Sequence, residues 1–302
     1  MTSTNPHFFF MKWTIIFAIL LVAVISYRFL YPRPENFDQR EPFVMKRNEE
    51  ALDDFYIELY DPLHDVKSRT NEELLHILKT TDPSTQHSVF LDVGSGTGNI
   101  VSELTDAGYK AYGVEKCRKM VEYSQNQYPD IEVLKGDVLE PMMFEKGVFT
   151  HVLCTYFTIY QIENKLKFFR NCYHWMQPGG YLVIHVVDKD KFERIIPNKD
   201  AIAKREQRAS QTVLDIKAIF NDYEYKGSFE IPNESAHVVM KETLTDIETR
   251  NIRQNETDLY MEDTKKVLEF ARQAGFIYHA KTSMTDMNGD KNQYLYYLER
   301  PL

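Results

Sequence analysis

One segment constrains the fold of this chain more than any other, the run VFLDVGSGTGNI at residues 89–100. Its composition predicts a short buried strand, a turn and the start of a helix. Glycines alternate at Gly94, Gly96 and Gly98, so the backbone can turn tightly and approach a ligand without a Cβ in the way. The segment therefore predicts a strand, turn and helix unit of an α/β fold with a ligand at the turn.

The chain around this segment alternates in the same way. Further short apolar runs are separated by stretches long enough for a helix, which is the pattern of a parallel sheet covered on both faces. These runs are KAYGVE, IEVLKGD, HVLCTYF and YLVIHVVD. Before the first strand, Thr70 and Glu73 form a capping box that predicts a helix over about 71–79. We expect a doubly wound, mostly parallel α/β sheet.

The C-terminal part departs from simple alternation. HVVMKETLTDIET and QYLYYLE flank the helical pattern TKKVLEFARQA, which predicts an antiparallel pair at the end of the sheet. Residues 189–235 are more than one crossover needs, so we expect an insertion there, with a helix over 205–220. The insertion either covers the mouth of the ligand site or is a surface excursion.

Two acidic residues follow the next strands. Glu115 ends the second strand, 23 residues after Asp92, where a carboxylate can accept hydrogen bonds from ribose hydroxyls. Asp137 ends the third strand and adds an acceptor at the same edge of the sheet. A dinucleotide-binding loop needs a last glycine where this chain has Asn99. The pattern therefore favours an adenosine-bearing ligand other than NAD.

Together, LDVGSGTG, Glu115, the pair Gly136–Asp137 and WMQPGGYLVI resemble the class I S-adenosylmethionine-dependent methyltransferases. The resemblance is detailed over residues 89–188 and extends to the remainder only in the order of elements. It implies a seven-stranded sheet, S-adenosyl-L-methionine as the cofactor and methyl transfer as the reaction.

The resemblance also implies cofactor-binding residues. Asp92 and the glycine turn would hold the methionyl part and the ribose, and Glu115 would bind the ribose hydroxyls. The adenine would meet Asp137 and Val138, with Lys116 and Met120 near its face. The full set of cofactor-side candidates is Asp92, Gly94, Ser95, Gly96, Gly98, Glu115, Lys116, Met120, Asp137, Val138 and Cys154.

The acceptor side is less defined. After the fourth strand, Tyr156, Thr158, Tyr160 and Gln161 either line an acceptor pocket or pack the following helix. A general base is needed only if the acceptor loses a proton. His185 and Asp188, late in the fifth strand, are the candidates, although a buried histidine is commonly held by backbone partners.

Two further clusters are candidates for contact with the ligands. Tyr56 and Tyr60 lie four apart on one helical face, which suits an aromatic lid over the cofactor or a packing stripe. Arg250, Arg253 and Tyr260 lie close together in sequence, either for an anionic acceptor or at the solvated end of a strand.

The N-terminus predicts a membrane anchor over residues 1–31. Residues 13–27 carry no charge, and apolar flanks extend the run enough to span a bilayer. Basic residues follow this run and only Lys12 precedes it within the segment, so a single-pass protein would keep its catalytic domain in the cytosol. A cleaved signal peptide is the alternative. Residues 32–50 are polar and predict a linker, which places the methyltransferase domain at 51–302.

Composition narrows the partners. A net charge of −9 disfavours nucleic acid, and the spacing of the three cysteines suits neither a metal site nor a disulfide framework. We expect a small-molecule or membrane-associated acceptor and find no feature that fixes an oligomeric state. The alternatives are methylation of a protein at the membrane surface and a non-catalytic, cofactor-binding scaffold.

Overall fold

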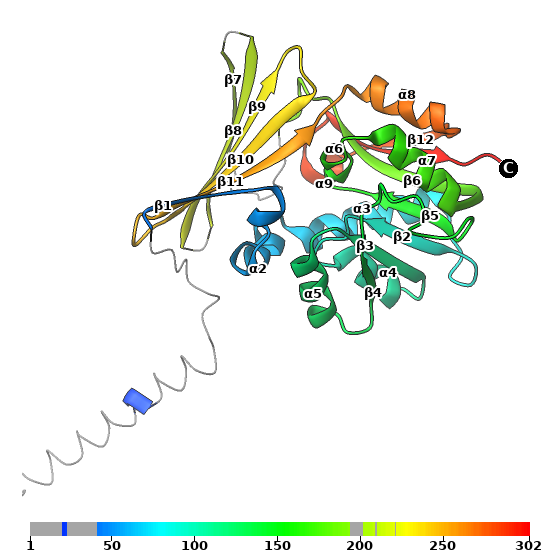
Figure 1. Cartoon of the computed structure of the whole chain (residues 1–302), viewed down its shortest axis with the longest axis horizontal. Coiled ribbons are helices and arrows are strands. Elements are labelled where there is room, and N and C mark those ends of the chain that lie inside the picture. Colours follow the sequence, from blue (N-terminus) through cyan, green and yellow to red (C-terminus); the bar gives the residue numbers. More distant parts are fainter. Residues whose placement is uncertain (1–19, 23–40, 194–201, 209, 221) are drawn as a thin grey trace, which may run out of the picture. The chain divides into compact units, whose positions relative to one another are not determined.

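A computed structural model describes residues 20–22, 41–193, 202–208, 210–220 and 222–302 (Figure 1). The chain divides into two units, Met1–Asp38 and Gln39–Leu302, and every element named below belongs to the second. The predicted anchor, residues 1–31, lies outside the described residues except for 20–22. In the described ranges, no helix is long and apolar enough to cross a membrane.

The larger sheet of the second unit has seven strands in the order β12-β13-β6-β5-β2-β3-β4. All strands run in one direction except β13, which is antiparallel to both of its neighbours, so the sheet is mixed. The bounds are β2 (Val89–Val93), β3 (Lys110–Glu115), β4 (Glu132–Lys135), β5 (Phe149–Cys154), β6 (Met176–Val187), β12 (Ile277–Ser283) and β13 (Gln293–Glu299). This confirms the α/β class. The antiparallel pair at the end is β12 with β13, so HVVMKETLTDIET was wrongly assigned to it.

Helices connect these strands as the alternation predicts. They are α4 (Asn99–Asp106), α5 (Arg118–Gln127), α6 (Thr158–Gln161), α7 (Lys165–Trp175), α8 (Thr264–Ala274) and α9 (Thr285–Asn288), with α2 (Asp54–Leu63) and α3 (Val66–Thr81) before the sheet. Helix α3 begins earlier than predicted because Asp65, in a left-handed conformation, separates it from α2. Thr70 therefore lies inside the helix, and Glu73 pairs with Arg69 instead of capping.

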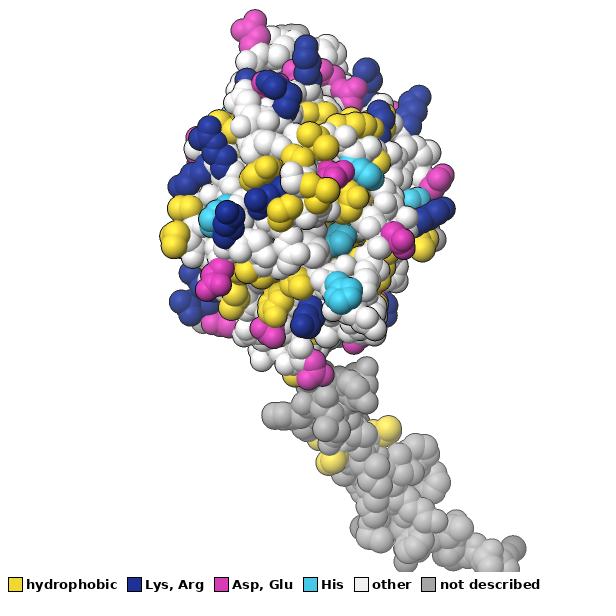
Figure 2. Space-filling view, turned by 90° about the vertical axis from the view of Figure 1, so that its right-hand side faces the viewer, with side chains coloured by type: hydrophobic (Ala, Val, Ile, Leu, Met, Phe, Trp, Pro, Cys, Tyr) yellow, Lys and Arg dark blue, Asp and Glu magenta, His cyan; other side chains and the backbone are white. Residues whose placement is uncertain are grey.

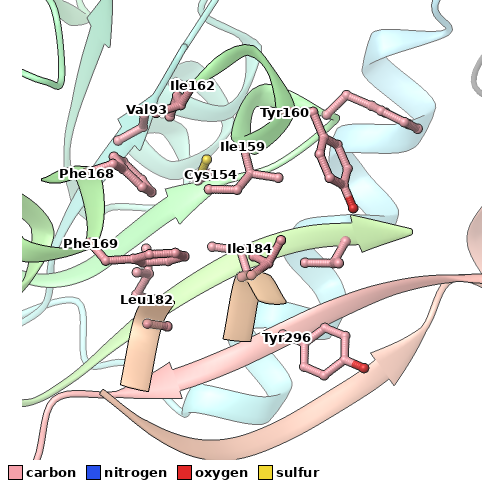
Figure 3. Packing of buried hydrophobic residues seen from close by; sticks show 14 of the residues in the cluster. Val93, Cys154, Ile159, Tyr160, Ile162, Phe168, Phe169, Leu182, Ile184 and Tyr296 are labelled. Atoms are coloured by element: carbon pink, nitrogen blue, oxygen red, sulfur yellow. The ribbon is translucent and has the colours of Figure 1, made fainter. Parts of the chain in front are cut away.

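The core lies between this sheet and its helices. Figure 3 shows Phe168 and Phe169 of α7 beside Leu182 and Ile184 of β6, and all four side chains are fully buried. Burial of such a side chain contributes about 1.5–3 kcal/mol to folding. The parallel strands are therefore rigid supports for the loops at their carboxyl ends.

A second sheet of six strands has the order β1-β11-β10-β9-β8-β7. Strands β7 to β11 form an antiparallel meander, and β1 pairs in parallel with β11. The bounds are β1 (Phe43–Arg47), β7 (Ile202–Arg208), β8 (Gln211–Phe220), β9 (Tyr223–Pro232), β10 (His237–Asp246) and β11 (Ile252–Tyr260), with the 3-10 turn η1 (Asn48–Ala51) after β1. Figure 1 shows this sheet beside the first, with β7 to β11 running from olive green through yellow to orange and β1 in blue.

The second sheet corrects two predictions. The helix expected over 205–220 is wrong, because most of those residues belong to β7 and β8. Thr212, Val213 and Ile216 are β-branched and favour an extended backbone, and β8 is fixed by its ladder with β9. Residues 43–50, assigned to the linker, form β1 and η1 because β11 offers a partner 209 residues away in sequence, as in the pair Phe43 and Ile252.

One face of the unit carries a group of hydrophobic side chains near its middle, with acidic and basic side chains around it (Figure 2). Among the exposed apolar residues, Ile277 and Tyr278 belong to the edge strand β12. The second edge of that sheet, β4, exposes Leu134.

Candidate active site

A cavity of about 880 Å³ lies at the carboxyl ends of β2, β3 and β5. Its lining also includes residues of η1, α2, α3, β10 and β11, so both sheets contribute to it. The volume falls in the usual range for small-molecule sites. In open α/β sheets, ligands bind at this edge, where the order of strands reverses.

The glycine turn forms one end of the cavity. Gly94, Gly96 and Gly98 all have positive φ, a conformation that L side chains rarely adopt. A Cβ at Gly94 would meet Thr158, and one at Gly98 would meet Ile131, whereas one at Gly96 would come no closer than 4.0 Å to its nearest neighbour, Gly94 O. Gly96 is therefore the position where the backbone leaves room for a ligand.

Glu115 is held at this turn by two backbone donors. Its carboxylate accepts from Gly96 N at 3.0 Å through Oε2 and from Cys117 N at 2.8 Å through Oε1. Burial raises the pKa of Glu115, and these two hydrogen bonds oppose that rise. Each carboxylate oxygen keeps a further lone pair for a donor from the ligand.

Other polar groups complete this end of the cavity. Asp92 is buried, and desolvation, with nearby Glu73, raises its pKa well above the ordinary value. Asp137 accepts from Leu139 N at 2.8 Å and pairs with Lys116 at 3.3 Å. Three buried atoms have no hydrogen-bond partner in the described part of the chain and belong to cavity-lining residues: Arg69 Nε, Thr70 Oγ1 and Ser95 Oγ. These atoms are available to hydrogen-bond a polar ligand.

Helix α2 covers the glycine turn. Asp61 accepts from Thr97 Oγ1 at 2.5 Å and from Asn99 Nδ2 at 2.9 Å. Tyr60, on the same helix, also lines the cavity, as the lid interpretation requires. The N-terminal helix is thus tied directly to the strand, turn and helix unit.

The other end of the cavity holds a chain of side-chain hydrogen bonds. Tyr156 Oη lies 2.8 Å from His64 Nδ1, and His64 Nε2 lies 3.3 Å from Tyr56 Oη. Tyr56 donates to Glu242 at 2.6 Å, and Tyr225 donates to the other oxygen of Glu242 at 2.9 Å. Burial lowers the pKa of His64 to about 3, so this imidazole is neutral. His64, Tyr225 and Glu242 were not predicted from the sequence.

Most predicted cofactor-side residues line this cavity. They are Asp92, Gly94, Ser95, Gly96, Glu115, Lys116, Met120, Asp137 and Val138, joined on the acceptor side by Tyr156, Thr158 and Gln161. Gly98, Cys154 and Tyr160 do not line it. Cys154 and Tyr160 instead lie in the hydrophobic cluster (Figure 3), where Val187 N donates to Tyr160 Oη at 2.9 Å.

The two candidate bases lie away from the cavity lining. His185 is buried, accepts from Phe157 N at 3.3 Å and lies 3.1 Å from Gln293 Oε1. Burial lowers its pKa to about 3. Asp188 pairs with Lys191 at 2.8 Å. This placement favours packing and loop-fixing roles for both residues over proton abstraction.

The expected arginine cluster is also divided. Arg253 is buried and bonds Asp53 at 3.0 Å and Ala51 O at 2.9 Å. Arg250 is exposed and pairs with Glu224. Tyr260 belongs to the cavity lining, but Arg250 and Arg253 do not. The interpretation as an anion site is therefore not supported by the geometry.

Comparison with known proteins agrees with this geometry. Residues 91–184 match the family described as "Methyltransferase domain". Residues 91–184 therefore belong to a methyltransferase domain. The matched stretch contains the glycine turn, Glu115 and Asp137. This confirms the predicted family and, with it, S-adenosylmethionine as the cofactor that the family uses.

Relatives of the methyltransferase domain are distant. An uncharacterized methyltransferase of Alkaliphilus oremlandii (strain OhILAs) is 24% identical over 136 residues, which cover 44% of this chain and 60% of that protein. The methyltransferase CcbJ of Streptomyces caelestis has a TM-score of 0.62 at 12% identity, covering 78% of this chain and 90% of its own. The glycopeptide N-methyltransferase MtfA in complex with S-adenosyl-L-homocysteine has a TM-score of 0.51 at 13% identity, covering 77% and 87%. The two solved structures share the fold.

The residues of the cavity fit the cofactor. The carboxylates of Asp92, Glu115 and Asp137 would hold the ribose and adenine, and the open side of Gly96 admits the ligand to the main chain. The unpartnered atoms of Arg69, Thr70 and Ser95 would take its polar methionyl end.

Proposed function

We propose that the protein transfers a methyl group from S-adenosylmethionine to a small molecule bound in the same cavity. The observation that carries this proposal is the continuity of the cavity, which joins Gly96 and Glu115 at one end to Tyr56 and Glu242 at the other. Because Tyr56 and Glu242 are 3% and 2% exposed, the acceptor end is a deep recess and not a surface groove. A recess suits a small molecule better than a protein side chain on a large partner.

The chemistry asks mainly for alignment. The bound sulfonium supplies an activated methyl group, and holding the acceptor in line with it removes much of the entropic barrier. Glu115, Asp137 and the glycine turn fix one reactant. Tyr56, Tyr156 and Glu242 are rigidly hydrogen-bonded and fix the position of the other.

The experiment that tests this function has two readouts. Calorimetry with S-adenosylhomocysteine measures cofactor binding, and a labelled methyl donor with a fractionated extract of the source reveals the acceptor. We expect one-to-one binding and label in a small-molecule fraction. Label in a protein fraction would indicate a protein acceptor instead of a small molecule. Cofactor binding without any methyl transfer would favour a non-catalytic scaffold.

We also propose that residues 1–31 hold the domain at a membrane surface on its cytosolic side, where a membrane-associated acceptor would meet it. The support is the uncharged run at 13–27 and the basic residues that follow it. Flotation with liposomes should carry the full chain and not a chain that begins at residue 32. Equal flotation of the two chains would exclude the anchor.

A further inference from the structure

The lining of the cavity is strongly acidic. Eight carboxyl side chains belong to it, against three basic side chains, Arg47, Arg69 and Lys116. Arg69 is compensated by Glu73 at 3.4 Å, and Lys116 by Asp137 at 3.3 Å. A cavity whose lining has this excess of carboxyl groups attracts cations.

Aromatic rings surround the same space. Tyr56, Tyr60, Tyr156 and Tyr260 all belong to the lining, and the face of a tyrosine ring attracts a cation. Carboxylates combined with tyrosine faces form the chemical environment of an ammonium ion. An anionic acceptor would be repelled by the carboxylates and by the faces of the tyrosine rings.

The hydrogen-bond chain at this end has a direction. The single proton of Tyr56 goes to Glu242, so the Tyr56 oxygen accepts from His64 Nε2–H. A neutral imidazole with a proton on Nε2 has a free lone pair on Nδ1, which accepts from Tyr156. Every donor in this series of hydrogen bonds therefore points from Tyr156 towards the Glu242 carboxylate.

The backbone holds Tyr156 in place at a cost. Tyr156 and Phe157 are consecutive non-glycine residues with φ of 41° and 61°. Such conformations are strained and collect at functional sites. They place the Tyr156 ring under the Arg69 guanidinium, whose Cζ lies 3.7 Å from the centroid of that ring. They also bring the Tyr156 hydroxyl to His64. Burial raises the pKa of Tyr156 well above its ordinary value, and the Arg69 guanidinium only opposes that rise, so Tyr156 must take up one proton as it passes on its own.

We propose that the acceptor is a primary or secondary amine, which enters as its ammonium ion and gives up a proton through Tyr156, His64 and Tyr56 to Glu242. This inference rests on the proposed methyl transfer. An ammonium ion has an ordinary pKa near 10, whereas an alkyl alcohol is about as weak an acid as water, near 15.7. A carboxylate at the end of the chain is therefore a feasible proton acceptor for the amine and not for the alcohol.

The proton steps balance. The ammonium N–H bond breaks, its electron pair stays on nitrogen, and Tyr156 takes the proton as its own moves to His64 Nδ1. His64 Nε2 passes its proton to Tyr56, and the Tyr56 proton moves to Glu242. The freed nitrogen lone pair then forms the bond to the methyl carbon, and the electrons of the broken carbon–sulfur bond stay on sulfur. After product release, the same chain returns the proton to solvent.

The groups around Glu242 suit this role. Tyr56 of α2 and Tyr225 of β9 donate to it, and Arg253 of β11 is the nearby cation. Burial raises the pKa of Glu242, while the two tyrosines and Arg253 oppose that rise. Burial therefore disfavours the charged form of Glu242, which makes this carboxylate better able to take up one proton.

The first test measures binding alone. The full chain, loaded with S-adenosylhomocysteine, is titrated by calorimetry with benzylamine, phenethylamine, butylamine and ethanolamine, and with the alcohol that matches each. We expect at least one amine to bind about tenfold more tightly than its alcohol, and Glu242→Gln to remove that difference. If no amine is preferred over its alcohol, the proposal of an amine acceptor is overturned. Binding of S-adenosylhomocysteine in the same experiment would still support the cofactor site.

The second test follows the proton, with the amine that binds most tightly as substrate. Tyr156→Phe removes the first link and should slow methyl transfer about 100-fold at pH 7, the low end for a lost general base. The loss should shrink about tenfold for each pH unit gained, because the free amine is then supplied by solvent. Tyr225→Phe touches Glu242 but lies off the path, so its rate should follow pH as the wild type does. A loss in Tyr156→Phe that is the same at every pH would show a structural role and sink the relay.

Discussion

The two ends of the cavity are built in different ways. The cofactor end comes from residues 89–138, where three successive strands end side by side and the backbone of one turn faces the ligand. The acceptor end joins α2, the loop after β5 and strand β10, so that Tyr56 and Glu242 meet across 186 residues of sequence. One end is local and made largely of main chain, and the other is assembled from distant side chains.

This difference shows which part of the site is free to vary. A backbone turn with positive φ tolerates almost no change, because most residue types are strained there. A cluster of tyrosines, histidine and carboxylates changes its chemistry with one substitution while the sheet beneath it stays the same. We infer that cofactor and acceptor recognition are separable in this molecule, and the following predictions test that separation.

The largest effect is expected for Gly96→Val. A valine side chain would enter the open space beside the turn, where the cofactor approaches the main chain, and cofactor affinity should fall more than 100-fold. Calorimetry with S-adenosylhomocysteine measures the loss. The matched control is Gly108→Val, which has a positive φ of 86° but lies outside the cavity lining. Equal losses of affinity in the two variants would attribute the effect to strain and not to the site.

Glu115→Ala should come next. The carboxylate would no longer accept from Gly96 and from the ribose, and a lost hydrogen bond to a charged group corresponds to about 1.5–3 kcal/mol, or roughly 10–150-fold in affinity. Glu132→Ala, at an exposed position of β4, is the control and should bind normally. Retention of full affinity by Glu115→Ala would break the assignment of the ribose carboxylate.

The same contrast explains what the sequence allowed us to predict. Gly96, Glu115 and Asp137 were identified because strand ends and turns are local patterns with a fixed spacing. His64 and Glu242 carry no such pattern, since their meaning depends on contacts between β10 and α2. His185 looked catalytic because it lies in a strand near the cofactor, yet its side chain points into the core.

The second sheet was missed for a related reason. Residues 205–220 contain enough polar and long side chains to read as a helix, and only pairing with β9 decides for a strand. Strand β1 likewise gains its structure from β11 and not from its own sequence. Long-range pairing, which leaves a weak local pattern, accounts for both errors.

A smaller effect tests the acceptor end by stability. Glu242 has a raised pKa in the folded state, so its contribution to stability is complete below its ordinary value of 4.5 and is lost as pH rises through the folded value. Relative to Glu242→Gln, the wild type should therefore lose unfolding free energy as the pH rises from 4.5 to 8. Urea denaturation of both proteins across this range measures the difference. Glu230→Gln, at a partly exposed carboxylate paired with Lys241, is the control. If the unfolding free energy of the wild type instead rose relative to that of Glu242→Gln as the pH increased, the hydrogen bonds from the two tyrosines would outweigh the effect of burial on the pKa of Glu242.

The smallest effect is expected when residues 1–31 are removed. Every residue that lines the cavity lies between Arg47 and Tyr260, so the shortened chain keeps both ends of the site. Its affinity for S-adenosylhomocysteine should stay within about twofold of the full chain, a change of at most about 0.4 kcal/mol. A chain that begins at residue 51 is the informative contrast, because it lacks β1 and the lining residues Arg47, Asn48, Glu49 and Glu50. If the first truncation weakened binding as much as the second, residues before β1 would belong to the site, and a cavity with only two ends would be the wrong description.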